Sequence, residues 1–255
     1  MNNSACRVLE ILELFADSPE PLTLTDITQK LGYPKTSVFD IINILCQHDF
    51  LRRADERAKT YVMGVRAYQV GMAYLQHTSL PSLAHPVLSD IRDRLGETCY
   101  LAIEENGMLV YLDKLESDAP IRASCRIGSR NHLYRTGLGK AILAAWTDDH
   151  VKAVCPGPYE IHTPNTIPDI ETLLTVLAQT RVRGYATDLG EDSPYIRCVA
   201  APVYDAAGHV HAAVSISMLD AAFTKEKEAA AAKEIIAAAQ YLSRQMGYMG
   251  ELYPR

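Results

Sequence analysis

Two serines near the carboxyl end of the chain are the first residues whose spacing indicates chemistry. Ser215 and Ser217 alternate within "HAAVSISM", so on a β-strand both hydroxyls lie on one face. Cys198 belongs to "IRCVAAPVY", the strand expected to pair with this one across the turn "DAAG". Two hydroxyls and a thiol on one sheet face can hydrogen-bond the carboxylate or hydroxyls of a small ligand. The alternative is that these side chains fill a core.

A second set of donors is expected where the helix "GLGKAILAAW" begins. Its first amides have no acceptor within the helix and lie at the positive end of the helix dipole, which suits a carboxylate. Asp188 lies at the end of a predicted helix–strand segment and can accept a hydrogen bond from a ligand hydroxyl. We therefore predict a small-carboxylate site formed by Gly137, Leu138, Asp188, Cys198, Ser215 and Ser217.

The other polar residues near this segment have simpler expected roles. Arg130 and Arg135 are expected on the solvated surface, although a guanidinium would suit a carboxylate. Lys140 is expected to anchor its own helix locally. His209 and His211 are two residues apart on a strand and would need a third ligand to hold a metal, so we expect exposed histidines. The sequence predicts neither a metal nor a cofactor.

A different kind of site is indicated by "LGYPKTSVFDIINIL", residues 31–45. Its apolar residues, from Val38 to Leu45, have the spacing of a helix with one buried face. On the other face, Asn can pair with adenine, Asp can accept from cytosine N4 and Phe can contact a thymine methyl. The residues at the start of the helix are better placed for phosphate. The predicted DNA contacts on this helix are Lys35, Thr36, Ser37, Phe39, Asp40 and Asn43.

The neighbouring segments complete a winged helix-turn-helix. "SACRVLEILELFAD" predicts a first helix, and "TDITQKLG" predicts a second that begins at the N-cap Thr25 and ends at Gly32. "FLRRADERAKTYVMG" predicts a hairpin. In such a module the third helix enters the major groove, and the hairpin lies near the DNA backbone. Its predicted phosphate contacts are Arg52, Arg53, Arg57 and Lys59. The alternative is a surface helix with no DNA role.

Net charge does not exclude DNA binding. The whole chain carries −6, but residues 30–66 carry seven Lys or Arg against four acids, a net of +3. Phosphate contacts and base contacts are made by different side chains, so Asp40 can read a base if neighbouring cations hold the phosphates. A dimer would double the basic footprint.

The remaining composition is that of an ordinary globular protein of 255 residues, with 48% hydrophobic and 22% charged residues. The absence of a long apolar run and of a signal peptide predicts a cytoplasmic protein. Six widely spaced cysteines with no CxxC predict free thiols. We predict a DNA-binding domain at 1–65, a linker helix at 66–78 and an α+β ligand-binding domain at 79–255.

Within 79–255 we expect a mixed sheet flanked by helices. "LAHPVLSDIRDRLG" and "PDIETLLTVLAQTRVRG" predict helices, the latter ending at Gly184, and "TKEKEAAAAKEIIAAAQYLSRQMG" predicts a long closing helix. "TCYLAIEENGMLVYLDKL" predicts a hairpin, and "IRASCRIG" is expected to extend the sheet.

These segments resemble a known family. The first fifty residues resemble the amino-terminal domain of IclR-type bacterial regulators, and "RIGSRNHLYRTGLGKAILAAW" and "RCVAAPVYDAAGHVHAAVSISM" resemble the two signature stretches of their effector domain. "TGLGKAILA" and "SRQMGY" are most similar to the KdgR-like branch, which senses sugar acids. The resemblance implies a GAF-like effector domain, a sugar-acid or 2-keto-acid effector, and dimers, often paired into tetramers, on palindromic operators. It also implies effector contacts at the six residues named above.

The chain departs from the family pattern at four positions. Asp40 stands where the third helix usually has a base, Gly190 stands where the family commonly has an acid, and Tyr195 where it commonly has glycine. His132 stands where the sugar-acid branch often has proline. These departures bear on the operator sequence and on the ligand.

Two other classes of function compete with an effector-responsive regulator. A cysteine-dependent enzyme acting on a small carboxylate would use Cys198 as nucleophile and would need a positioned base, but no histidine shares a recognisable motif with Cys198. A pure interaction module would need no ligand, which leaves the paired serines and the glycine at the helix start without a role. We therefore predict a transcriptional regulator.

Overall fold

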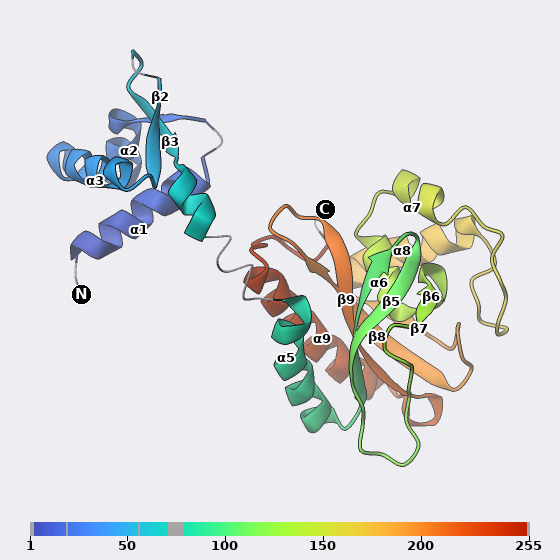
Figure 1. The fold of residues 1–255 in the computed structure, drawn as a ribbon. Coiled ribbons are helices and arrows are strands. Elements are labelled where there is room, and N and C mark those ends of the chain that lie inside the picture. The colour runs from blue at the N-terminus through green and yellow to red at the C-terminus, as the bar shows by residue number, and fades with distance from the viewer. Residues whose placement is uncertain (1–2, 19, 56, 71–78, 254–255) are drawn as a thin grey trace. The chain divides into compact units, whose positions relative to one another are not determined.

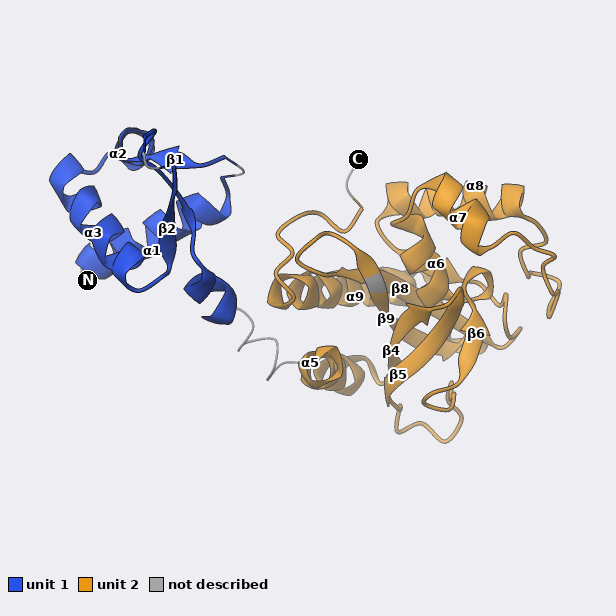
Figure 2. Ribbon diagram, turned by 45° about the horizontal axis from the view of Figure 1, so that its top comes forward, with its two compact units in different colours: residues 1–78 blue, residues 79–255 orange. Residues whose placement is uncertain are grey.

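The computed structural model describes residues 3–18, 20–55, 57–70 and 79–253. The chain divides into two compact units, residues 1–78 and 79–255 (Figure 2), each with its own hydrophobic core. None of the described helices is long and apolar enough to cross a membrane.

The first unit contains the predicted helices and hairpin (Figure 1). Its sheet is antiparallel, with β3 between β1 and β2. The predicted apolar face of the third helix is buried against Ile11 and Ile27 of the first two helices. The elements are α1 (Asn3–Ala16), β1 (Leu22–Thr23), α2 (Leu24–Leu31), α3 (Lys35–Gln47), β2 (Leu51–Asp55) and β3 (Thr60–Met63).

The predicted N-cap of α2 was wrong by two residues. The hydroxyl of Thr23 accepts from the amide of Asp26, and the Asp26 carboxylate accepts from the amide of Thr23 at 2.8 Å. This reciprocal pair is a capping box, and the i, i+3 spacing of Thr23 and Asp26 was its signal. The helix ends at Gly32 as predicted, with φ of 69° in the left-handed region.

A further helix follows the hairpin. Residues 65–70 are helical, which agrees with the start of the predicted linker helix. The rest of that prediction, residues 71–78, lies outside the described residues. The side chains of Val65, Tyr68 and Val70 are more than half exposed.

The second unit is a six-stranded sheet with helices on both faces. The strand order is β6-β5-β4-β9-β8-β7, and every described pairing is antiparallel, so the expected mixed sheet was wrong. Helices α5 and α9 pack on one face, and α6, backed by α8, packs on the other (Figure 1). The elements are α5 (Leu80–Leu95), β4 (Thr98–Glu105), β5 (Met108–Leu115), β6 (Arg130–His132), α6 (Gly137–Ala144), α7 (Asp148–Val154), α8 (Ile170–Arg183), β7 (Ala186–Asp188), β8 (Ile196–Tyr204), β9 (Val210–Leu219) and α9 (Lys225–Gln245).

Both predicted hairpins of this unit are present. Between β4 and β5, Asn106 and Gly107 have φ of 54° and 78°, the two positive values that a two-residue hairpin turn of type I′ requires. Between β8 and β9, the Asp205 carboxylate accepts from the amides of Ala207 and His209, each at 2.9 Å. The turns fix the register that places Ser217 opposite Cys198.

The expected strand "IRASCRIG" was wrong. Residues 121–128 form an irregular segment, and the sheet is extended instead by β6. Side chains satisfy this segment's backbone: Thr98 donates to the carbonyl of Ala123 at 3.2 Å, and Lys114 donates to that of Cys125 at 2.9 Å. Alternating apolar residues here line a cavity wall, so the pattern resembles a strand without forming one.

Candidate functional site

Helix α3 presents the residues predicted to contact DNA. Lys35, Thr36, Phe39 and Asp40 are exposed, and Asn43 is half-buried beside the wing. Pro34 precedes the helix and makes no side-chain cap hydrogen bond. The first amides of α3 therefore remain available to an anion such as a phosphate.

Ser37 has a protein partner that the sequence did not indicate. Arg7 of α1 donates from Nη1 to the Ser37 hydroxyl at 3.2 Å, and its guanidinium lies 5.0 Å from the centre of the Tyr33 ring. The packing of α1 thus brings a cation to the start of α3. No spacing in the sequence links residue 7 with residue 37, so sequence reasoning missed Arg7.

A groove of about 520 Å³ runs between α3 and β2. Asn43 and Gln47 line it from the helix, and Arg52 and Arg53 line it from the strand. This arrangement places a base-reading type of side chain next to two cations. At the wing turn Arg57 and Lys59 are exposed. The Asp55 carboxylate holds that turn by accepting from the amides of residues 57 and 58 at 2.6 and 2.8 Å.

The second unit contains a cavity of about 470 Å³, and all six residues predicted for the ligand line it. Gly137 and Leu138 reach it from α6, Asp188 from β7, Cys198 from β8, and Ser215 and Ser217 from β9. Tyr100, Tyr111, Arg122, Cys125, Asp192 and Tyr195 also line it. The cavity lies on the sheet face that α6 covers.

The first two amides of α6 have no acceptor within the helix. Thr136 caps the helix by accepting from the amide of Gly139 at 2.9 Å. The preceding amides, those of Gly137 and Leu138, have no acceptor within the helix. A Cβ at Gly137 would lie 3.3 Å from that of Cys198, so glycine lets α6 approach β8 closely.

Ser215 has a buried hydroxyl without a partner. Its side chain is 1% exposed, and its oxygen makes no hydrogen bond to any described residue. Leaving such a group unpaired costs about 1–3 kcal/mol, and buried polar groups without a partner call for an explanation. Ser217, by contrast, shares a hydrogen bond of 2.9 Å with the thiol of Cys198.

Asp188 is a buried carboxyl group on the cavity wall. Its Oδ1 accepts from the amides of Gly190 at 2.9 Å and Glu191 at 2.8 Å. Burial raises the pKa of Asp188 to about 7; Lys140 opposes this shift, while Glu191 and Asp192 add to it. Both of these hydrogen bonds use Oδ1, so Oδ2 is the atom that can meet a ligand hydroxyl.

The cavity thiols are not activated. Burial raises the pKa of Cys198 above its usual range and that of Cys125 to about 11. A nucleophilic cysteine needs a lowered pKa. No histidine is among the described residues that line the cavity. The described residues of the cavity therefore offer neither a thiolate nor a histidine base for cysteine catalysis.

Lys140 anchors α6 to a distant segment and not to its own helix. It is fully buried, and its ammonium group contacts the carboxylate of Glu191. Hydroxyls from another loop fasten the same segment: Thr163 donates to the carbonyl of Gly190 and Thr166 to that of Glu191, each at 2.6 Å. The loop after β7 is therefore fixed on two sides.

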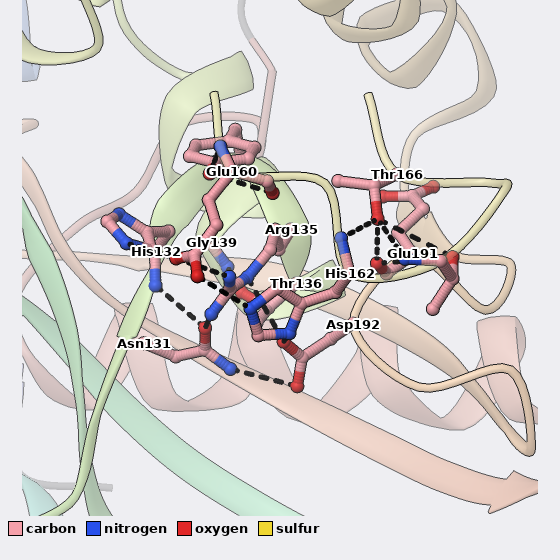
Figure 3. Close-up of polar contacts among 12 residues, drawn as sticks. Asn131, His132, Arg135, Thr136, Gly139, Glu160, His162, Thr166, Glu191 and Asp192 are labelled. Atoms are coloured by element: carbon pink, nitrogen blue, oxygen red, sulfur yellow. Dashed lines mark hydrogen bonds and ion pairs between the residues drawn. The ribbon is translucent and has the colours of Figure 1, made fainter. Parts of the chain in front are cut away.

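Arg135 was expected on the surface, but its side chain is only 8% exposed. Its Nε lies 3.1 Å from Asp192, and its Nη2 donates to Asn131 at 2.8 Å (Figure 3). Asn131 in turn donates to Asp192 at 3.1 Å. Asn131 belongs to β6 and Asp192 follows β7, so these side chains join the two edges of a curled sheet. Arg130 pairs with Glu105 on the surface.

Three of the four departures from the family pattern, Gly190, Tyr195 and His132, lie in the second unit, and Tyr195 lines the cavity. Gly190 has φ of 86°, in the left-handed region, and this backbone conformation favours glycine over an acid. Tyr195 is 75% exposed and lines the cavity. His132 lies 3.9 Å from Glu160 (Figure 3).

The metal possibility rests on His211, whose side chain lies outside the described residues. Among the side chains that are described, no group of three or more His, Cys, Asp or Glu is arranged to hold a metal ion.

A winged helix-turn-helix unit joined to an α/β unit with an internal cavity is the plan of a transcriptional regulator. Comparison with known proteins identifies the family of regulators to which the chain belongs. Residues 4–55 match the IclR helix-turn-helix domain, and residues 72–244 match the family described as bacterial transcriptional regulator IclR C-terminal. The chain belongs to the IclR family of bacterial transcriptional regulators.

Similar proteins cover nearly its whole length. It is 32% identical over 248 residues to the HTH-type transcriptional regulator KdgR of Escherichia coli, covering 96% of this chain and 93% of KdgR. It is 31% identical over 243 residues to XynR of the same organism, covering 95% and 96%. The crystal structure of the Agobacterium tumefaciens repressor BlcR superposes with a TM-score of 0.81 at 27% identity, covering 98% of this chain and 99% of that one. The relatives are regulators, so the chain is a transcriptional regulator and not an enzyme.

Proposed function

We propose that this regulator changes its affinity for operator DNA when a small carboxylate, a sugar acid or a 2-keto acid, binds in the cavity. The observation that carries the proposal is the unpartnered, buried hydroxyl of Ser215. It lines the same cavity as the first amides of α6. A ligand that supplies a carboxylate to these donors removes the cost of leaving them unpaired.

The ligand contacts follow from the donors present. The amides of Gly137 and Leu138 hold the carboxylate at the positive end of the α6 dipole. Ser215 and Ser217 contribute hydroxyls, and Asp188 accepts from a ligand hydroxyl through Oδ2. Cys198 contributes shape and a weak hydrogen-bonding group. The similarity to KdgR supports a sugar acid.

DNA is held by the first unit. Lys35, Thr36 and Ser37, with the open amides of α3, contact phosphate, as do the wing cations Arg52, Arg53, Arg57 and Lys59. Phe39, Asp40 and Asn43 contact base edges in the major groove. Operator DNA lies in the bacterial cytoplasm, so we place the protein there.

The protein acts as a homodimer or a dimer of dimers. Large apolar side chains of the first unit are exposed, among them Leu9 at 59%, Val65 at 61% and Tyr68 at 67%. Two recognition helices on a palindromic operator also double the phosphate contacts. Light scattering of the full chain at micromolar concentration tests this assembly, and a monomer would contradict it.

Calorimetric titration of sugar acids and 2-keto acids tests the ligand. Ser215→Ala with Ser217→Ala removes hydrogen bonds worth about 0.5–1.5 kcal/mol each, more with a charged ligand. Affinity should fall by about ten-fold to a hundred-fold, while the unliganded variant still binds the operator. Ser89→Ala, on α5, is the matched control and should not change affinity.

The regulatory step has its own requirement. An effector shifts operator affinity only if it binds two states of the protein unequally. The acid that binds most tightly should therefore also shift the operator titration of the wild type and fail to do so in the double variant. Equal affinity in both proteins would refute this site.

A further inference from the structure

One carboxylate on the cavity wall belongs to none of the predicted ligand contacts. Asp192 lies in the segment between β7 and β8, lines the cavity and has a side chain that is 34% exposed. Arg135 lies beside its Oδ1 at 3.1 Å, and Asn131 donates to its Oδ2 at 3.1 Å (Figure 3). Two carboxylate oxygens have about four acceptor positions, so Asp192 keeps positions for a ligand.

The neighbouring charges leave this wall negative. The single guanidinium of Arg135 is shared between Asp192 and Glu160, at 3.1 and 3.4 Å. His162 lies 3.4 Å from Glu160 and 3.9 Å from Asp192, and His132 lies 3.9 Å from Glu160. Two carboxylates therefore face one guanidinium, and burial lowers the pKa of the neighbouring His132.

The negative charge of Asp192 reaches the cavity interior. Burial is the largest cause of the raised pKa values of Asp188, Cys198 and Tyr111, and the charge of Asp192 adds to each of them. Lys140 opposes the shift at Asp188 and Cys198, but it does not line the cavity and its ammonium group contacts Glu191. Asp188, Cys198 and Tyr111 all line the cavity. An anion bound there feels the same field.

The guanidinium of Arg122 does not cancel the negative potential of Asp192 in the cavity. Arg122 lines the cavity, but both its Nε and its Nη2 donate to Glu116, at 3.1 and 2.8 Å. Among the described residues, the cavity therefore offers one built place for a carboxylate, the start of α6, and faces any second carboxylate with Asp192.

The cavity volume leaves room for a ligand that extends well beyond its carboxylate. About 470 Å³ is the share of roughly fifteen water molecules at about 30 Å³ each. A three-carbon acid fills a small part of this space. The rest of the space is lined by further wall residues, which include Asp192.

We propose that Asp192 is a specificity-determining residue, which accepts hydrogen bonds from ligand hydroxyls and excludes a second carboxylate. The cavity thereby selects polyhydroxy monocarboxylates over the dicarboxylates of the same carbon chain. This inference rests on the proposed function and names the ligand class more narrowly.

Pairs of ligands that differ only at the end of the carbon chain opposite the first carboxylate test this selectivity. Aldonates and aldarates of matched stereochemistry, such as gluconate with glucarate, galactonate with galactarate and xylonate with xylarate, are titrated calorimetrically into the full-length protein. The wild type should bind an aldonate more tightly than its aldarate. Asp192→Asn should weaken the aldonate about three-fold to ten-fold and should lower the aldonate-to-aldarate affinity ratio about ten-fold.

Two controls distinguish a loss of this selectivity from damage to the fold. Asp149→Asn makes the same charge change at a side chain that is 99% exposed, and it should leave the ratio unchanged. Glycerate, a three-carbon acid that fills a small part of the cavity, should bind wild type and Asp192→Asn with equal affinity if the start of α6 is intact.

The outcomes are distinct. An unchanged ratio in Asp192→Asn, with aldonate binding still lost in the double serine variant, overturns this inference and leaves the proposed function standing. A wild type that prefers the aldarates also overturns it. If no acid binds the wild type, the proposed function and this inference fall together.

Discussion

The buried Lys140–Glu191 ion pair makes a sharp prediction about stability. Lys140 is fully buried in α6, and the Glu191 side chain is 10% exposed. Lys140→Met keeps most of the apolar stem but removes the ammonium group. The Glu191 carboxylate then stays in the interior without its cation.

The expected cost is large for a single substitution. Breaking a buried ion pair by removing one partner costs about 3–5 kcal/mol. Burial already raises the pKa of Glu191, and Lys140 opposes that shift. Without Lys140, Glu191 takes up a proton more readily, so we expect the lower end of this range at neutral pH. Lys140→Met combined with Glu191→Gln removes both charges and should recover most of the loss.

Urea unfolding of the full chain, followed by tryptophan fluorescence, measures this cost. Trp146 is the single tryptophan and belongs to the second unit, so its signal reports the unfolding of that unit. Lys152→Met is the matched control, because Lys152 is 54% exposed and exposed pairs contribute about 0–1 kcal/mol.

The double-mutant cycle decides the interpretation. A loss below about 1 kcal/mol in Lys140→Met would refute the view that the pair anchors α6. A double variant as unstable as the sum of the single variants would show that the two residues do not act as a pair.

Further predictions concern pH and DNA. The pKa of Asp188 is near 7 in the folded protein and about 4 in the unfolded chain. Its contribution to the free energy of unfolding is therefore full below pH 4 and is lost as the pH rises through 7. Asp188→Asn keeps an acceptor for the two amides, so in urea titrations it should show less of this pH dependence. Arg52→Ala and Arg57→Ala should each weaken binding to every DNA sequence and flatten the salt dependence by about one unit, measured by fluorescence anisotropy. Asp40→Ala should change the preference between operator variants, whereas Asp17→Ala, which removes an exposed acid at the end of α1, should not. If both acid variants strengthen all DNA equally, Asp40 is only a repulsive charge.

Much of the fold could be predicted because local patterns determine it. The apolar residues from Val38 to Leu45 repeat with the period of an α-helix. Asn106 and Gly107 readily adopt the positive φ values that a tight hairpin turn needs. The cap of α2 was misplaced because two threonines, Thr23 and Thr25, lie near the start of the helix, and only the reciprocal contact with Asp26 identifies Thr23 as the cap.

The candidate site was predictable where strand alternation decides it. Ser215, Ser217 and Cys198 share a sheet face by period and register alone. The pairing of Arg135 with Asp192 and of Lys140 with Glu191 could not be predicted, because only the tertiary fold brings these segments together. Arg7 was missed for the same reason. Long-range side-chain pairs follow from tertiary packing and leave no periodic signal in the sequence.

The strand order has a consequence for how the protein reaches its folded state. Strands β4–β5–β6 form one meander and β7–β8–β9 another, and in the described sheet they meet through the β4–β9 ladder. Each meander is built from contacts close in sequence, whereas the ladder joins residues such as Tyr100 and Ser215. Distant pairings form slowly because a long loop must close first. Ser215 lies on that ladder, so the cavity wall is complete only after β4 and β9, the two paired strands most distant in sequence, have joined. A chain emerging from the ribosome therefore has no complete cavity until β9 has been synthesised.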